Sequence, residues 1–203
     1  MVVSVLGGIV LFTGLLTFVA IRSSRASDAA SLAIKAENIR AECGALLVGP
    51  DFLWGVWQDT AKAAAMKFFI RDASDTEVTT VTKVAVPLDG VLQHFVLEGL
   101  RYEISKLSPM SKRTVLRKAG SDAVLLAADH YLNRTEFFRG DGENALCVVP
   151  QVSVLRRFRP IKLVDEEIGK VIVGLKGNWL AVVMTLPEGR YSELERVFVF
   201  ASR

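Results

Sequence analysis

The chain has 203 residues, of which 51% are hydrophobic, and a formal net charge of +3. This composition excludes a disordered chain, and the small net charge without a long basic run excludes a nucleic-acid-binding surface. Beyond its first segment, the chain is long enough for one globular domain with a substantial core.

The first twenty-one residues carry no charged side chain, and Arg22 and Arg25 follow at once. At ~1.5 Å per residue, residues 2–21 form a helix of about 30 Å, which matches the hydrocarbon thickness of a bilayer. We therefore predict a transmembrane helix over residues 1–22. A cleavable signal peptide is the alternative, but the apolar run is about twice the usual ~7–15 residues, and two arginines stand where a cleavage site is small and uncharged.

The charges that flank this helix predict its orientation. Arg22, Arg25, Lys35 and Arg40 all follow it, so the N-terminus is expected outside and the following domain on the cytoplasmic side of a bacterial or organellar inner membrane, or in the matrix or stroma. Small residues within the helix permit close packing against other membrane helices; they are Gly7, Gly8 and Gly14.

Residues 23–66 are expected to form a helical juxtamembrane connector. The stretch from Ala26 to Ala45 is rich in Ala, Glu, Lys and Arg, which favour helix, and Gly49-Pro50 ends it. A second short helix is expected over Asp51–Met66. The aromatic residues near its start, Phe52, Trp54 and Trp57, suit either an interfacial contact with lipid or packing against the domain.

From residue 67 to 203 we predict an antiparallel β domain, a sandwich or closed barrel, because short β-branched and aromatic runs alternate with turn signals. The predicted strands are Phe68–Arg71, Glu77–Val86, Gln93–Leu97, Tyr102–Leu107, Thr114–Lys118, Ala123–Ala128, Thr135–Arg139, Ala145–Val149, Arg156–Val164, Lys170–Lys176 and Trp179–Leu186. Turns are expected at 119–122, 140–143 and 165–169, where Gly and Asp recur. The last segment, Glu193 to Ala201, fits a helix or a strand.

A succession of short strand segments runs from Phe95 to the C-terminus: 101–104, 113–116, 124–127, 136–138, 157–163 and the hairpin 165–171. This succession resembles the tubby-like superfamily, which includes LURP-one-related proteins and phospholipid scramblases. The resemblance implies a twelve-stranded barrel around a hydrophobic C-terminal helix, and contact with phosphoinositides or other lipids. Glu193, Glu195 and Arg196 make the last segment of this chain more polar than the central helix of that group.

No catalytic or metal-binding motif occurs in the sequence, so we expect a protein that is not an enzyme and needs no cofactor. His94 and His130 have no partner residues at metal-ligand spacing, which favours structural roles. The run Gly140–Asn144 is too short for an EF-hand loop and predicts a hairpin turn. Cys43 and Cys147 stand in dissimilar contexts, which predicts reduced structural thiols.

Two groups of basic residues are the candidate binding site, for anionic lipid head groups. The first is Lys112, Arg113, Arg117 and Lys118, and the second is Arg156, Arg157 and Arg159. Lysine and arginine are also common on strand edges, where they prevent edge pairing, so a structural role is the alternative.

These observations favour a non-enzymatic, single-pass membrane-anchored accessory or assembly subunit of a larger membrane protein complex. Its expected partners are the bilayer and other integral membrane subunits, with no nucleic acid. The alternative is an anionic-lipid-binding or scramblase-like membrane protein, whose partners are anionic lipids.

Overall fold

The computed structural model describes residues 34–44, 47, 51–60, 65–84, 90–142, 144–150, 158–175 and 178–202. The predicted transmembrane helix over 1–22 lies outside these residues, as do Gly7, Gly8 and Gly14. Within the described part of the chain, no helix has the length and apolarity needed to cross a membrane.

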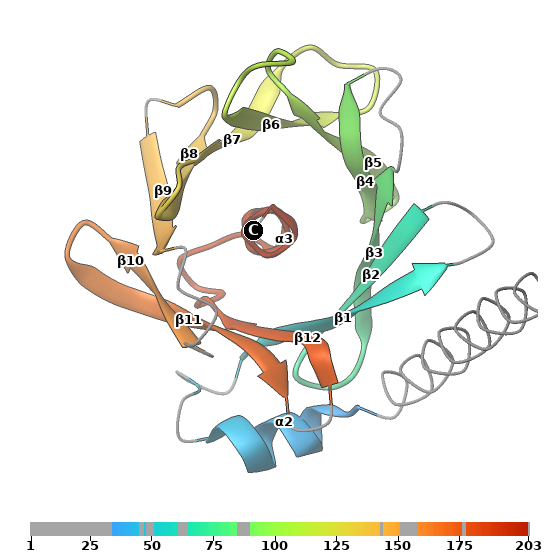
Figure 1. The fold of residues 1–203 in the computed structure, drawn as a ribbon, viewed down its shortest axis with the longest axis vertical. Helices are drawn as coiled ribbons and strands as arrows, with labels where there is room; N and C mark the ends of the chain where they lie inside the picture. The colour runs from blue at the N-terminus through green and yellow to red at the C-terminus, as the bar shows by residue number, and fades with distance from the viewer. Residues whose placement is uncertain are drawn as a thin grey trace, which may run out of the picture.

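Within the described residues, twelve antiparallel strands form a closed barrel (Figure 1). Each strand pairs with the next one along the chain, and the first pairs with the last, so that Leu53 lies opposite Met184. The strands are β1 (Leu53–Thr60), β2 (Ala65–Arg71), β3 (Glu77–Val84), β4 (Val91–Leu97), β5 (Leu100–Lys106), β6 (Arg113–Lys118), β7 (Val124–His130), β8 (Arg134–Arg139), β9 (Asn144–Pro150), β10 (Phe158–Leu163), β11 (Glu166–Leu175) and β12 (Asn178–Thr185).

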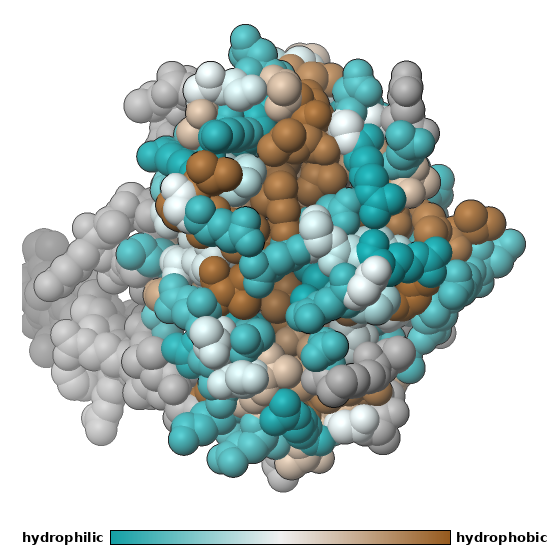
Figure 2. Space-filling model, turned by 180° about the vertical axis from the view of Figure 1, so that it is seen from behind, coloured by the Kyte–Doolittle hydropathy of each residue, from teal (hydrophilic) through white to brown (hydrophobic). Residues whose placement is uncertain are grey.

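The eleven predicted strands are confirmed as β2 to β12, with ends that differ by a few residues. The sequence left a sandwich and a barrel open, and the pairing of β1 with β12 decides for the barrel. The turns predicted at 119–122 and 140–143 are confirmed, and Gly120 and Gly140 adopt positive φ in them. The turn predicted at 165–169 is wrong in extent, because β11 begins at Glu166 and the chain reverses at Val164 and Asp165. On the face shown in Figure 2, most side chains are hydrophilic and surround a hydrophobic band, whereas the apolar core lies inside the barrel.

The last segment is a helix, α3 (Glu193–Ala201), and it lies along the middle of the barrel (Figure 1). Four consecutive residues, Val197 to Phe200, are at most 1% exposed. Phe198 meets Phe137 edge to face, with ring centroids 5.8 Å apart, and Phe200 lies 5.1 Å from Phe68. Strands from opposite walls of the barrel therefore share one core that is centred on α3.

A capping box begins α3. The Ser192 hydroxyl accepts a hydrogen bond from the Glu195 backbone N–H at 3.3 Å, and the Ser192 N–H donates to Glu195 Oε2 at 2.8 Å. These two hydrogen bonds satisfy the backbone N–H groups of Ser192 and Glu195. They favour a helix over a strand for the segment that the sequence left open.

The polar residues of α3 are accommodated by ion pairs. Glu195 accepts from Arg139 of β8 at 2.6 Å, and Arg196 pairs with Glu188 in the connection after β12. Burial alone would raise the pKa of Glu195, but the hydrogen bonds from Arg139 and Ser192 outweigh it and lower that pKa. Glu195 therefore joins the helix to the barrel wall, and Arg196 joins it to the connection after β12.

The prediction of a helix over Asp51–Met66 is wrong, because β1 and the start of β2 occupy this stretch. Both faces of β1 are apolar: Leu53 and Trp57 pack in the barrel core, whereas Trp54 and Val56 pack in a second cluster outside it. A strand that is buried on both faces lacks the alternation of polar and apolar residues that identifies a strand in the sequence. The aromatic residues therefore serve the core, one of the two interpretations left open above.

The second cluster lies beneath α2 (Ala36–Cys43), the helix described within the predicted connector. Ile39 of α2 is fully buried in this cluster with Ile172 and Val183. The Ala36 N–H donates to Asp75 Oδ1 at 2.7 Å, and Arg40 donates to the Ala73 carbonyl at 2.7 Å. Helix α2 is therefore fixed to the outside of the barrel by both apolar and polar contacts.

The two cysteines lie in different clusters, and no disulfide joins them: Cys43 is the last residue of α2 and belongs to the second cluster, whereas Cys147 lies in the barrel core. Burial raises the pKa of the Cys147 thiol. Both residues behave as buried apolar side chains, as the sequence predicts.

Gly169 lies at an irregularity of the β10–β11 ladder, and a Cβ there would come within 2.1 Å of the Thr185 carbonyl oxygen. We expect Gly169→Ala to lower the free energy of unfolding by about 3 kcal/mol, because the neighbouring backbone must move. Gly189→Ala is the matched control, since no atom lies within 4 Å of its Cβ position, and it should change stability by less than about 0.5 kcal/mol. Chemical denaturation of the full chain in mild detergent measures both values, and equal stability of the two variants would contradict the close approach.

Candidate functional site

The first predicted basic group lies along β6, but its members differ in environment. Lys112, just before β6, is exposed, and its Nζ lies 3.9 Å from the centre of the Tyr131 ring. Arg117 donates to the Asp122 carbonyl at 3.2 Å and to Ser105 Oγ at 3.1 Å. Lys118 is exposed at the other end of the strand. These side chains share a strand without forming one cluster of charge.

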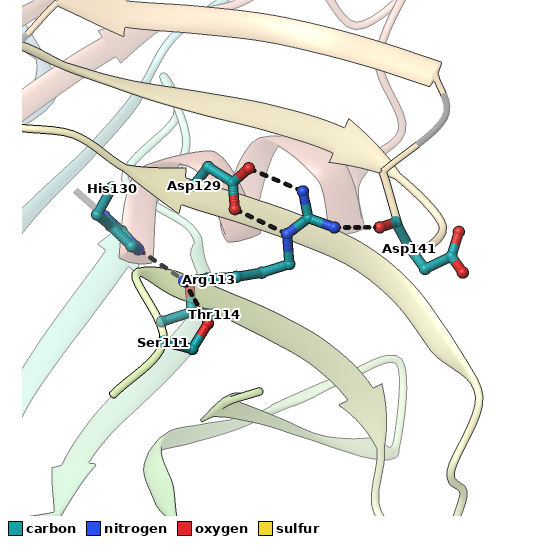
Figure 3. A network of polar contacts seen from close by, with 6 residues as sticks. All are labelled: Ser111, Arg113, Thr114, Asp129, His130 and Asp141. Atoms are coloured by element: carbon teal, nitrogen blue, oxygen red, sulfur yellow. Dashed lines mark hydrogen bonds and ion pairs between the residues drawn. The ribbon is translucent and has the colours of Figure 1, made fainter. Parts of the chain in front are cut away.

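Arg113 is the centre of a polar network on the outside of the barrel (Figure 3). Its Nε and Nη2 atoms donate to the two carboxylate oxygens of Asp129 on β7, each at 2.7 Å. Its Nη1 donates to the Asp141 carbonyl at 2.5 Å, in the turn between β8 and β9. A bidentate pair of this kind holds the guanidinium in one orientation. Arg113 therefore joins β6, β7 and the β8–β9 turn, and its charge is already paired.

The surroundings of Arg113 are shaped to this network. The ring of Phe138 lies 5.6 Å from the guanidinium carbon, and a Cβ on Gly142 would come within 2.8 Å of Nη1. The hydrogen bond from Arg113 lowers the pKa of Asp129, although burial opposes the shift, and the same bond raises the pKa of Arg113. Both groups are thus stabilised in their charged forms.

Of the second predicted group, only Arg159 is described, and it is not next to the first group, because β7, β8 and β9 lie between β6 and β10. Arg156 and Arg157 lie outside the described residues. Arg159 lies opposite Val171, a residue of the barrel core, and its Nε is buried without a hydrogen-bond partner among the described residues. Burial lowers the pKa of Arg159.

The structure instead gathers two loops at one end of the barrel. We call this surface the loop end, and define it as residues 106–112, around the β5–β6 connection, and 130–134, around the β7–β8 connection. The His130 N–H donates to the Lys112 carbonyl at 3.0 Å, and the guanidinium of Arg134 lies 4.8 Å from the Tyr131 ring that Lys112 also contacts. The loop end therefore holds cations from both loops around one aromatic ring.

Most of the loop end was not predicted as a site. Lys106, Tyr131 and Arg134 were not singled out, nor were the exposed apolar residues Leu107, Met110 and Leu132. The signal in the sequence is the presence of large apolar residues inside turn segments, where Gly, Asn, Asp, Pro and Ser are usual.

The histidines take structural positions. His130 Nε2 lies 2.9 Å from Thr114 Oγ1, and Nδ1 lies 3.4 Å from Thr135 Oγ1. Burial lowers the pKa of His130 and also that of His94. Among the described residues, no group of three or more His, Cys, Asp or Glu side chains could hold a metal ion.

Comparison with known proteins adds little to this geometry. No family model and no curated protein matches the chain. Among solved structures, it is similar to the X-ray structure of a protein from Arabidopsis thaliana, with 16% sequence identity over 76% of this chain and 94% of that one. The TM-score is 0.32, so the likeness carries no argument about family or function.

The Arg113–Asp129 pair predicts a pH dependence of stability. At neutral pH, Asp129→Asn is expected to lower the free energy of unfolding by about 2 kcal/mol, because it leaves a partly buried guanidinium without its carboxylate. The folded pKa of Asp129 lies below its unfolded value of about 3.9, so its contribution is complete above the unfolded pKa and is lost as the pH falls through the folded pKa.

The difference in the free energy of unfolding between the native chain and Asp129→Asn should therefore become smaller as the pH falls. Denaturation at a series of pH values measures it. Asp122→Asn is the control, since the Asp122 side chain is exposed and only its carbonyl accepts a hydrogen bond from Arg117. If the difference in the free energy of unfolding between the native chain and Asp129→Asn stays constant down to the most acidic pH at which the chain folds, the ion pair does not stabilise the folded state as described.

Proposed function

We propose that this chain is a non-enzymatic, single-pass membrane-anchored accessory subunit of a larger membrane protein complex, in which the barrel is the docking domain. The observation that carries the proposal is the occupation of the barrel interior by α3. Since Val197 to Phe200 fill the space between the strands, the outer surface and the loops are what the barrel offers to a partner.

The polar chemistry of the barrel supports the same interpretation. Two pairs of charged groups beside the core, Glu195 with Arg139 and Arg196 with Glu188, are ion pairs that position α3. Arg113 and Asp129 are joined in a pair that positions a turn. Groups arranged in this way stabilise a scaffold and are not poised for proton transfer or nucleophilic attack.

We further propose that the chain is a distant member of the tubby-like superfamily. The support is architectural: twelve described strands close around a C-terminal helix, which is the arrangement that the resemblance in the sequence implies. This proposal concerns ancestry and fold, and it assigns no ligand to the chain.

In the proposed arrangement, residues 1–22 span the membrane and the barrel faces the cytoplasm, matrix or stroma. The arginines after the apolar segment support this orientation.

The test is purification of the tagged full chain from its native membrane in mild detergent, with mass spectrometry of the proteins that accompany it. We expect stoichiometric integral membrane partners, and their loss when residues 2–21 are replaced by an unrelated apolar span of equal length. The matched control replaces the same residues by a shuffled sequence that keeps Gly7, Gly8 and Gly14 in place. Recovery of the native chain without any stoichiometric partner would refute the proposed role.

A further inference from the structure

Two hairpins of the loop end present large apolar side chains to solvent. In the β5–β6 connection, the Ser111 N–H donates to the Ser108 carbonyl at 3.0 Å, which closes a turn with Pro109 and Met110 at its tip. Met110 is 100% exposed and Leu107 is 54% exposed. The turn is well ordered by hydrogen bonds, so the exposure of Met110 follows from the fold of the loop itself.

The second hairpin repeats this feature. The Tyr131 N–H donates to the Arg134 carbonyl at 2.8 Å, which leaves Leu132 and Asn133 as the two tip residues, and Leu132 is 98% exposed. Two-residue tips usually carry Gly, Asn or Asp, which tolerate the backbone conformation and prefer water. A leucine in this place gains nothing from the barrel, because it contacts neither core.

The two tips point from the same end of the barrel. In a barrel whose strands follow one another, the β5–β6 and β7–β8 connections lie at one end and the β10–β11 connection lies at the other. The loops are also in direct contact, because the ring of Tyr131 lies against Lys112 and the His130 N–H bonds to the Lys112 carbonyl. Apolar side chains of separate hairpins therefore share one surface.

This surface is positively charged. Residues 106–112 and 130–134 contain Lys106, Lys112 and Arg134 but no acidic residue. Arg134 pairs with Glu136 at 2.5 Å, whereas neither lysine has a carboxylate partner among the described residues. The nearby carboxylate of Asp129 is held by Arg113. Lys106 Nζ donates to the Pro109 carbonyl at 3.5 Å, and Lys112 Nζ lies against the Tyr131 ring. Two ammonium groups without a carboxylate partner among the described residues thus flank the exposed apolar tips.

We propose that the loop end docks onto the surface of an anionic lipid bilayer. Met110, Leu132 and Leu107 enter the boundary between head groups and acyl chains, and Lys106 and Lys112 meet the anionic head groups. Exposed apolar residues beside lysines are the composition of interfacial membrane contacts, in which apolar burial and electrostatic attraction add. The charge complementarity favours a bilayer, since head groups supply anions on all sides of the two tips. This docking goes beyond the proposed subunit role and does not depend on it.

The test uses an environment-sensitive fluorophore on the purified full chain in bilayers of phosphatidylcholine with or without phosphatidylserine. The label is placed at Met110→Cys or Leu132→Cys in separate variants, and the native cysteines stay unlabelled because they are buried. Val164→Cys is the matched control: Val164 is an exposed apolar residue on a hairpin tip at the opposite end, followed by Asp165 and Glu166.

We expect quenchers attached to the acyl chains to quench the labels at positions 110 and 132, but not the label at 164, and only with phosphatidylserine present. Lys106→Gln and Lys112→Gln should each weaken the docking equilibrium by about fivefold. Labels at 110 and 132 that are quenched no more than the label at 164 would overturn the proposal. Equal quenching of the labels at 110 and 132 with and without phosphatidylserine would also overturn it. The same holds if these labels become buried only in native membranes and crosslink there to a protein. None of these results bears on the partners recovered in the detergent purification, so the two proposals fail separately.

Discussion

The interior of the barrel must be filled, and the rest of the structure depends on how α3 does so. Eight strands enclose a space that their own inward side chains fill, and wider barrels leave room for a ligand or a channel. With twelve strands in the described chain, the space is taken by α3, whose residues 197–200 are apolar on every side. A helix that is hydrophobic all round is stable only when it is buried all round. The strands and the helix therefore need each other: Phe68 and Phe137 would face an open cavity without Phe200 and Phe198.

The polar end of α3 determines where the helix sits. Glu195 contributes to the capping box and also accepts from Arg139, so one carboxylate joins the helix start to β8. A negative side chain in the first turn is favoured by the helix dipole. Arg196 is nearly buried, and a buried cation is tolerated only with a partner, which Glu188 supplies. The polar residues of this segment thus fix the depth of the helix in the barrel, and the aromatic residues fix its packing.

The sequence predicts the strands that consist of β-branched and aromatic runs between recognisable turns, including β12, which is buried on both faces. Strands β2 to β12 were found from their pattern and their Gly and Asp turns, whereas β1 was missed because α2 covers its outer face, leaving Trp54 and Val56 as apolar as Leu53. The sequence did not decide between helix and strand for residues 193–201, because four consecutive apolar residues show neither helical nor strand periodicity. Ser192 and Glu195 do stand at the spacing of a capping box, which is a signal for a helix.

The site was less predictable because it depends on register. That Arg113 faces Asp129 across the β6–β7 ladder follows from the pairing of strands, and no local pattern around residue 113 reveals it. The contact between Lys112 and Tyr131 likewise needs two loops that are distant in the sequence.

The closure of the barrel also limits how a partner can bind. Because β1 pairs with β12, the described strands form a closed barrel without a terminal edge strand. The weakest junction is the one between β9 and β10, where the described pairing is the single pair Val148 and Lys162. The outer faces of the strands near α2 are covered by that helix, and those near Arg113 are crossed by the β8–β9 turn. At the loop end, backbone groups are already hydrogen-bonded within each turn, so recognition there must rely on side chains. On this surface, exposed apolar tips and lysines without a carboxylate partner among the described residues are available to interact, so the composition of the loop end carries more information about a partner than the fold does.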